Sequence, residues 1–383
     1  MTADRTIVVG GGLIGLFAAY ELARRGRRVL VLERDEIASG TTGASFAWLN
    51  ATSKIEPDYH RLNAAGLACH RALAQAWGEH VVGSYGSGAI WWAEPGIGGG
   101  VDALAAHYGE LIALGYPCLW LERKALAALE PHVRFADGAA GLFAPGDRWL
   151  EAERLARHVA REIERLGSDV RENTAVTGVE RSGDGRVSAV TTAEGRLETE
   201  SLVLAAGPAS AEAVAMVNGE AATAFPVDRV PGLLVTLPPD RMRDMVRHVL
   251  YAPDSDEFHI RPTAEGGLML GSDDVDAMVA DDPDAETLAA ATRALLERGR
   301  RHVPDLPADS HGHDVVRRIG VRPMPRDGRT IAGPLPGVPG CYVVATHSGI
   351  TLAPLLGELI AEEIVTGQVA DILAPFRPDR FGV

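Results

Sequence analysis

The alternation of hydrophobic and polar positions is most regular at the start of the chain, where residues 5–34 read RTIVVGGGLIGLFAAYELARRGRRVLVLER. The β-branched run at residues 7–9 predicts a strand that enters a glycine-rich turn. A helical pattern continues through Arg25, and Gly26 ends it before a second apolar run at residues 29–32. We therefore expect a strand, a glycine turn, a helix and a second strand in direct succession.

The glycines of this turn have the spacing that a bound pyrophosphate requires. Gly10 permits the tight turn, Gly12 lets the backbone approach a ligand, and Gly15 lets the helix pack against the strand. Free N–H groups and the dipole at the helix N-terminus favour an anion. Glu33 follows the second strand and is placed to accept hydrogen bonds from a ribose diol. A glycine turn without a ligand is the alternative, but the complete unit favours a site for FAD or NAD(P).

The middle of the chain mixes helical and strand-like patterns. Apolar residues at three- and four-residue spacing predict helices at residues 56–80, 102–114, 124–129, 150–166 and 285–301. Short strands with Gly-containing turns are predicted at residues 83–100, 169–206, 226–239 and 249–272. A second, mainly β domain is expected at about 225–315, so the sequence predicts an α/β fold of two domains.

Two later segments each place an apolar strand before a small or polar turn. Residues 202–206 run into Ala-Gly-Pro, where a ligand can approach the backbone closely. Residues 341–345 precede a polar turn and a helix that we expect to end near Thr366 and close at Gly367. Pro354 is expected in the first turn of that helix, where its missing N–H costs little. The N-terminus of this helix is a second positive dipole end.

Composition narrows the class of partner. The chain has 383 residues and a formal net charge of −15, which argues against nucleic acid and anionic membranes as partners. No apolar run reaches the roughly 20 residues of a membrane helix, and the first strand begins too early for a signal peptide. The three cysteines, Cys69, Cys118 and Cys341, suit neither a disulfide framework nor a metal cluster. We expect a cytoplasmic protein without a metal.

Taken in order, five motifs resemble the FAD-dependent D-amino acid oxidase superfamily, near its glycine oxidase and sarcosine oxidase branch. They are GGGLIG with Glu33, SGTTGAS at residues 39–45, LVLAAG, RPMPRDGRTIAGP, and ATHSGITLAPLLGELIAEEI. The last two, at this separation from the first, are the most specific. The resemblance implies FAD rather than NAD, held by a Rossmann-like domain of discontinuous segments with a β-rich substrate domain over the flavin. It divides the chain into a cofactor domain, 1–80, 140–224 and 316–383, and a substrate domain, 81–139 and 225–315.

The resemblance also implies the reaction. These enzymes oxidise the C–N bond of an amino acid or N-substituted amino acid to an imine, which water hydrolyses, while the cofactor carries the chemistry. It places the cofactor contacts at Gly10, Gly12, Leu13, Ile14, Gly15, Glu33, Arg34, Thr41, Thr42, Ala44, Ser45, Val176, Ala206, Gly207, Gly349, Ile350 and Thr351. The last three lie where the C-terminal helix would point its N-terminus at the flavin, so that oriented N–H groups would stabilise negative charge on the reduced ring.

Arg322 matches the arginine that holds the substrate carboxylate in these relatives, a role that suits the geometry of a guanidinium. A structural salt bridge is the alternative. His347 precedes the C-terminal turn and is expected near the flavin, where it tunes the ring, touches substrate or simply packs. Trp48, Asn50 and Lys54 follow the SGTTGAS loop and are candidates for the substrate pocket.

Three positions depart from the relatives. His259 stands where several of them use a tyrosine to grip the carboxylate, so the substrate need not be a simple small amino acid. Met269, also a pocket candidate, stands where sarcosine oxidases carry a lysine that promotes reaction with oxygen. No cysteine precedes Arg322 in the segment where sarcosine oxidases attach their flavin, so FAD is expected to bind non-covalently.

Four functions remain open on the sequence. An oxidase would pass electrons to oxygen, whereas a dehydrogenase would pass them to a quinone or carrier, as Met269 suggests. A flavin-binding subunit without turnover is the third, and the intact motifs argue against it. A flavin monooxygenase is the fourth, and we find no second dinucleotide motif for NAD(P)H. A homo-oligomer is compatible with all four.

Overall fold

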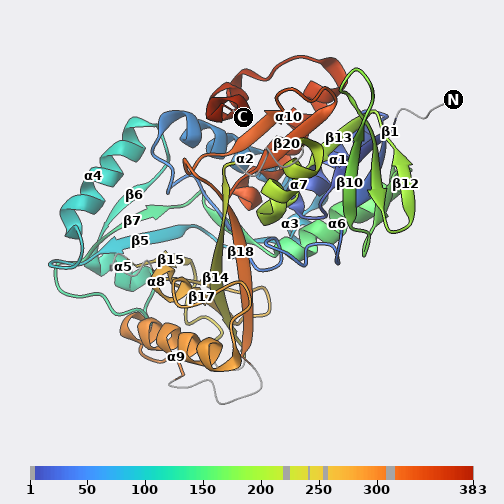
Figure 1. The fold of residues 1–383 in the computed structure, drawn as a ribbon. Coiled ribbons are helices and arrows are strands. Elements are labelled where there is room, and N and C mark those ends of the chain that lie inside the picture. The colour runs from blue at the N-terminus through green and yellow to red at the C-terminus, as the bar shows by residue number, and fades with distance from the viewer. Residues whose placement is uncertain (1–4, 219–224, 240–241, 253–257, 308–314, 383) are drawn as a thin grey trace.

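The computed structural model describes residues 5–218, 225–239, 242–252, 258–307 and 315–382. Its strands form two large sheets and two small ones, with helices packed around them (Figure 1). This arrangement confirms the predicted α/β fold class.

The first large sheet contains the predicted N-terminal unit. Its strand order is β19 (Ile331–Pro334), β20 (Cys341–Ala345), β13 (Ser201–Leu204), β1 (Arg5–Val9), β2 (Arg28–Leu32) and β9 (Asp169–Arg171). All neighbours are parallel except β19, which runs antiparallel to β20. The predicted strands at 7–9, 29–32 and 341–345 therefore lie in one sheet, although the last is more than 300 residues from the first.

Both faces of this sheet are covered, which explains why its strands read as continuous apolar runs. Val8 and Val31 point into one core, whereas Ile7 and Leu30 point into another. The first core is covered by α1 (Leu13–Arg24), α2 (Pro57–Trp77), α6 (Ala152–Arg165) and α10 (Gly349–Thr366). The second is covered by α7 (Ser210–Asn218) and a small sheet of β10 (Val176–Arg181), β11 (Val187–Thr192) and β12 (Gly195–Glu198).

The second large sheet has eight strands. Their order is β18 (Val316–Pro325), β14 (Val227–Leu237), β17 (Leu268–Gly271), β16 (His259–Pro262), β15 (Val249–Tyr251), β5 (Ala89–Ala93), β7 (Ala140–Ala144) and β6 (Leu119–Glu122). Helices α5 (Arg123–Leu129) and α9 (Ala285–His302) share its separate hydrophobic core. Strands β7 and β18 thus both belong to this sheet, although the predicted boundaries assign their residues to the cofactor domain. The division into domains stays a prediction.

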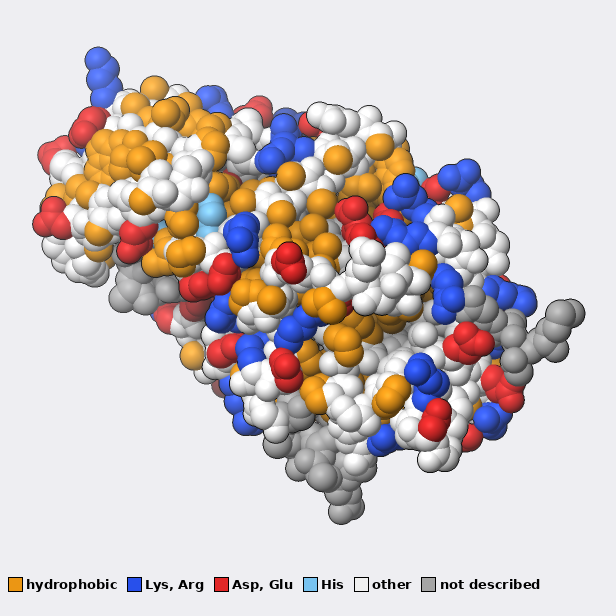
Figure 2. All heavy atoms as spheres, turned by 90° about the horizontal axis from the view of Figure 1, so that it is seen from above, with side chains coloured by type: hydrophobic (Ala, Val, Ile, Leu, Met, Phe, Trp, Pro, Cys, Tyr) orange, Lys and Arg blue, Asp and Glu red, His pale blue; other side chains and the backbone are white. Residues whose placement is uncertain are grey.

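The remaining elements are short or peripheral. They are α3 (Glu79–Val82), α4 (Gly100–Ala113), α8 (Asp273–Asp276), a third sheet of β3 (Trp48–Leu49), β8 (Arg148–Leu150) and β4 (Ser84–Tyr85), and the 3-10 helices Gly207–Ala209, Asp371–Phe376 and Pro378–Phe381. In the described part of the chain, no helix is both long and apolar enough to span a bilayer. Basic and acidic side chains are interspersed on the face that Figure 2 shows.

The expected start of the C-terminal helix was wrong. Helix α10 begins at Gly349, so Pro354 is its sixth residue and lies beyond the first turn. The carbonyl of Ile350, four residues earlier, therefore lacks its usual helical donor. Nε2 of His70, in α2, lies 2.8 Å from that carbonyl oxygen and supplies the missing hydrogen bond. A side chain 280 residues away thus makes an internal proline tolerable, and the pattern of the helix itself could not reveal it.

Helices α1 and α10 approach each other so closely that a glycine is required between them. A Cβ added at Gly357 would lie 2.6 Å from the backbone carbonyl carbon of Phe17. Helix α1 follows β1 and α10 follows β20, and these strands run parallel in the first sheet, so both helices begin at the same end of that sheet.

We predict that Gly357→Ala lowers the free energy of unfolding by about 1–3 kcal/mol, because the added methyl group forces two backbones apart. The matched control is Gly109→Ala in α4, where a Cβ would meet nothing within 4 Å. That substitution should raise stability by up to about 1 kcal/mol, since alanine is the better helix former. Urea unfolding of both variants checks the pair; equal effects would contradict the close helix contact.

Candidate active site

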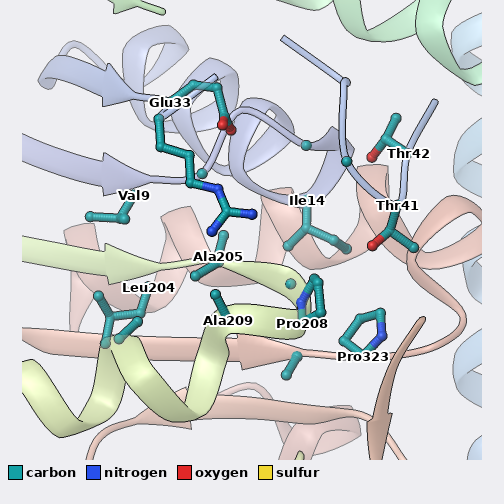
Figure 3. A pocket seen from close by; sticks show the side chains of 18 of the residues that line it. Val9, Ile14, Glu33, Thr41, Thr42, Leu204, Ala205, Pro208, Ala209 and Pro323 are labelled. Carbon is teal, nitrogen blue, oxygen red and sulfur yellow. The ribbon is translucent and has the colours of Figure 1, made fainter. Parts of the chain in front are cut away.

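A cavity of about 440 Å³ opens where four parallel strands end (Figure 3). Val9, Leu32, Leu204 and Ala345 are the last residues of β1, β2, β13 and β20, and all four line it. Open α/β sheets bind their ligands in this position, outside the carboxyl ends of the strands. The cavity therefore coincides with the site that the glycine turn predicted.

The glycine turn forms one wall of the cavity. Gly10 has a φ of +113°, and a Cβ there would lie 2.3 Å from the carbonyl oxygen of Ala205. A Cβ at Gly15 would lie 2.1 Å from the carbonyl oxygen of Gly10, so this glycine lets α1 pack against the turn. Only glycine fits the first position, because the conformation and the space both exclude a side chain.

The first turn of α1 is held toward the cavity by a hydroxyl. Thr42 Oγ1 accepts a hydrogen bond of 3.2 Å from the N–H of Leu13, and a Cβ at Gly12 would lie 3.1 Å from the same oxygen. Thr41 Oγ1 donates to the carbonyl of Val321 at 2.6 Å, which ties the SGTTGAS loop to β18. Figure 3 shows Thr41, Thr42 and Pro323 around the cavity.

Glu33 closes the opposite edge. Its Oε2 accepts a 2.6 Å hydrogen bond from the N–H of Gly11, and its Oε1 accepts one of 3.0 Å from the N–H of Asp35. The carboxylate is thereby fixed at the rim, where an acid after the second strand meets a ribose in dinucleotide sites. Arg34 beside it is exposed and pairs with Asp35 at 3.0 Å.

Most of the predicted cofactor contacts line the cavity. These are Gly10, Gly12, Leu13, Ile14, Glu33, Arg34, Thr41, Thr42, Ser45, Val176, Ala206, Gly207, Gly349 and Ile350. Gly15, Ala44 and Thr351 lie behind it: Ala44 packs against Gly320, and Thr351 Oγ1 bonds the backbone of Trp48 and Asn50 at 3.4 Å each.

Sequence reasoning missed other lining residues. Among them are Pro208, Ala209, Arg229 and Pro323. The Ala-Gly-Pro turn pointed to the first two, but only the pairing of β14 with β18 brings the last two to the cavity.

Arg322 is not free to act as a lone cation. Its Nη2 donates to Asp276 Oδ2 at 2.9 Å, and its Nη1 lies 3.6 Å from Asp273 Oδ1. Burial raises the pKa of Asp276 to about 6, while Arg322 opposes that rise. The salt bridge that the sequence left as an alternative therefore exists, and any role in carboxylate binding must be shared with it.

A second basic group lies near the start of α10. Lys54 Nζ is 3.3 Å from Nε2 of His347, a residue that lines the cavity. Burial lowers the pKa of Lys54 to about 8. Burial, then the positive charges of Lys54 and Arg322, lower the pKa of His347 to about 3, so its imidazole is neutral at physiological pH.

Two pocket candidates, Trp48 of β3 and His259 of the second sheet, belong to an aromatic wall. Tyr251 lies between Trp91 and His259, with ring centroids 4.6 and 5.9 Å away, and Trp48 packs on the rings of Trp91 and Tyr251 at 5.8 and 5.9 Å. These rings form a stacked aromatic cluster that suits contact with an apolar group. Phe46 meets His259 edge-on at 4.5 Å.

Two candidates serve the scaffold instead. Met269 Sδ lies 3.4 Å from Nη2 of Arg261, a fully buried guanidinium that also donates to the carbonyl of Phe46 at 2.6 Å. Asn50 Oδ1 accepts from the hydroxyl of Ser53 at 2.8 Å and so closes the turn that precedes Lys54.

A buried carboxylate anchors this turn. Asp147 Oδ2 accepts from Thr52 Oγ1 at 2.7 Å and from Trp48 Nε1 at 3.1 Å, and Oδ1 accepts from the Tyr116 hydroxyl. Burial raises the pKa of Asp147 to about 7, although the hydrogen bonds from these three donors lower it. The segment that carries Lys54 is therefore held by a buried acid with no cation paired to it among the described residues.

Comparison with known proteins assigns the family. The family described as "FAD dependent oxidoreductase" (DAO) matches residues 5–363. This chain belongs to that family. It is therefore an FAD-dependent oxidoreductase, and the predicted cofactor and superfamily are confirmed.

Individual relatives cover almost the whole oxidoreductase. A glycine oxidase of Geobacillus kaustophilus (strain HTA426) is 28% identical over 376 residues, covering 96% of this chain and 95% of the relative. One of the subunits of an opine oxidase from Agrobacterium tumefaciens (strain Ach5) is 26% identical, covering 99% of this chain and 97% of the relative. A crystal structure of glycine oxidase from Geobacillus kaustophilus superposes with a TM-score of 0.84 at 26% identity, covering 99% of each chain.

The residues around the cavity fit FAD. Two helix N-termini face the cavity, a glycine cradle excludes side chains where phosphates would lie, and an acid stands at the rim. Gly10, Gly12 and the α1 N-terminus would hold the pyrophosphate, Glu33 the ribose, and the α10 N-terminus the flavin.

We predict that Asp147→Asn makes stability less dependent on pH. Because the folded pKa is raised above the ordinary value of 3.8, this carboxyl contributes stability that is present at acidic pH and lost as pH rises through about 7. Between pH 5 and 8 the variant should therefore gain about 2–3 kcal/mol relative to the wild type.

Urea unfolding at the two pH values measures this difference. Asp137→Asn is the matched control, because that side chain is fully exposed. A constant difference between wild type and Asp147→Asn across this range would show that the buried acid does not titrate as described.

Proposed function

We propose that this oxidoreductase oxidises the C–N bond of an amino acid or N-substituted amino acid, and that oxygen is the electron acceptor. The observation that carries the proposal is the cluster of basic groups where the flavin cavity meets the second sheet. Lys54 contacts His347, which lines the cavity, and Arg322 acts on the same imidazole. A carboxylate placed there would bring the adjacent C–N bond toward the cavity.

The protein's own groups would bind and position the substrate and stabilise charge on the flavin. Bound FAD supplies the chemistry by accepting a hydride equivalent from the carbon that bears the amine. The basic cluster would hold the carboxylate, and the aromatic wall of Trp48, Trp91 and Tyr251 would exclude water and position the N-substituent. The N–H groups of Gly349 and Ile350 would stabilise negative charge as it develops on the flavin ring. Because the imidazole of His347 is neutral, it would not donate a proton to the substrate amine.

The names of the relatives support this class of substrate. Glycine oxidases are prominent among them, and the opine oxidase relative supports an N-substituted substrate. The glycine oxidases among the relatives also favour oxygen over a quinone as the acceptor, because their names describe oxidases. The free cysteines fit a reducing compartment, which supports a cytoplasmic location.

The proposal is tested by anaerobic titration of the purified yellow protein. We expect glycine, sarcosine or a larger N-substituted glycine to bleach the oxidised flavin, and methylamine to leave it unbleached. Admitting air should then restore the absorbance, whereas restoration only by a quinone would identify a dehydrogenase. Failure of every amine to bleach a fully loaded protein would contradict the proposed function. Flavin released by acid precipitation would show non-covalent binding.

We predict that Arg322→Ala weakens the apparent binding of the bleaching amino acid by about tenfold, because one charge-assisted contact is lost. The matched control is Arg326→Ala, which removes an exposed guanidinium paired with Asp228 just beyond the same strand. Equal titration curves for wild type and Arg322→Ala would remove this arginine from the substrate site.

A further inference from the structure

Lys54 is an unusual cation for this chain. It is one of only two lysines, the other being Lys124, whereas arginine supplies the remaining basic side chains. Its side chain is half-buried, and no carboxylate among the described residues forms an ion pair with it. Its ammonium contacts Nε2 of His347 at 3.3 Å and lies 5.8 Å from the ring centroid of Tyr59. A partly desolvated charge without a counterion is unfavourable, so a bound anion would stabilise it.

The charge around Arg322 is different. Asp276 and Asp273 offset its single positive charge at 2.9 and 3.6 Å, and Asp276 also accepts a 2.7 Å hydrogen bond from the N–H of Leu233. An incoming carboxylate at Arg322 would therefore meet two acidic side chains, whereas at Lys54 it would meet none that the structure describes. Of the two cations, Lys54 is the one whose described surroundings leave its charge uncompensated.

The position of Lys54 is also fixed in advance. Its N–H donates to the carbonyl of Ala51 at 3.1 Å, and its own carbonyl lies 2.8 Å from Nδ1 of His60. Thr52, two residues earlier, is bonded to buried Asp147 at 2.7 Å. A binding group whose supporting contacts are already formed loses little entropy when its ligand arrives.

We propose that Lys54 is the principal anion-binding residue of the catalytic centre and receives the carboxylate of the substrate, with Arg322 as a secondary contact. This inference rests on the proposed function, because it names the group that recognises the substrate. The acidic pair behind Arg322 leaves Lys54 as the stronger attraction for a monocarboxylate.

The test uses acetate as the probe and the oxidised holoenzyme, so no turnover is needed. Acetate binding is followed as a perturbation of the flavin absorbance. Lys54→Met should raise the Kd of acetate by about ten- to hundredfold, and Lys54→Arg should raise it less. Arg322→Ala should have a smaller effect than Lys54→Met. Lys124→Met, at an exposed position on α5, is the control with unchanged Kd.

Folding and flavin loading are checked separately. Methionine removes the charge and keeps the length of the chain, and Lys54→Gln provides a second neutral variant if the first loads poorly with flavin. An unchanged acetate Kd in both neutral variants would overturn the proposal, as would a larger loss in Arg322→Ala than in Lys54→Met. An unchanged Kd with a lowered flavin midpoint potential would mean that Lys54 serves the negative charge of the reduced ring instead, and would also overturn it.

The outcome is independent of the proposed reaction. If no amine bleaches the flavin but acetate binding still depends on Lys54, the proposed function fails and the anion site stands. If amino acids bleach the flavin while the Lys54 variants bind acetate normally, the function stands and the inference fails.

Discussion

The close backbone contact between the glycine turn and the end of β13 is the constraint on which the cavity depends. A Cβ added at Gly10 or at Gly15 would lie too close to a backbone carbonyl oxygen for any side chain to fit. These contacts bring β1, α1 and β13 together so that the N-terminus of α1 faces the ends of four strands. Gly357 likewise has no side chain, so α10 can pack closely against α1 and point a second N-terminus at the cavity. The cofactor site is thus produced by backbone packing, and its chemistry comes from dipoles more than from charged side chains.

The charged side chains of the site lie where the two large sheets meet. Strand β18 reaches the cavity with Pro323 and carries Arg322, while the segment from Trp48 to Lys54 contacts the start of α10. One of these cations is compensated by two carboxylates, and the other is compensated by none among the described residues. Asp147, a buried acid bonded to that segment, is occupied by three donors rather than by Lys54. Lys54 is therefore left without a carboxylate partner among the described residues, which is the arrangement expected of a site that binds an anionic ligand.

The sequence was sufficient wherever a signal is local. The strand, turn, helix and strand of residues 5–34 could be predicted from a short, local pattern. The roles of the glycines in the turn could also be predicted, because few other residues fit such tight backbone conformations. It was insufficient wherever a contact joins distant segments. The helix start near Pro354 was misplaced because its compensation comes from His70, and the acids beside Arg322 were missed because α8 returns to β18 across 46 residues. The contact between Lys54 and His347 spans 293 residues and leaves no local mark.

Two of the departures from the relatives become intelligible together once the second sheet is seen. The position where a lysine was expected holds Met269, and its cross-strand partner Arg261 fills the adjacent space with a guanidinium bonded to backbone carbonyls. His259, in place of a tyrosine, is stacked on Tyr251 and so belongs to the aromatic wall. This face of the sheet is therefore built for packing and shape rather than for gripping a carboxylate. A substrate with a carboxylate would then need its cation from another element, and Lys54 is the group that the fold brings there, while Asp273 and Asp276 compensate the charge of Arg322.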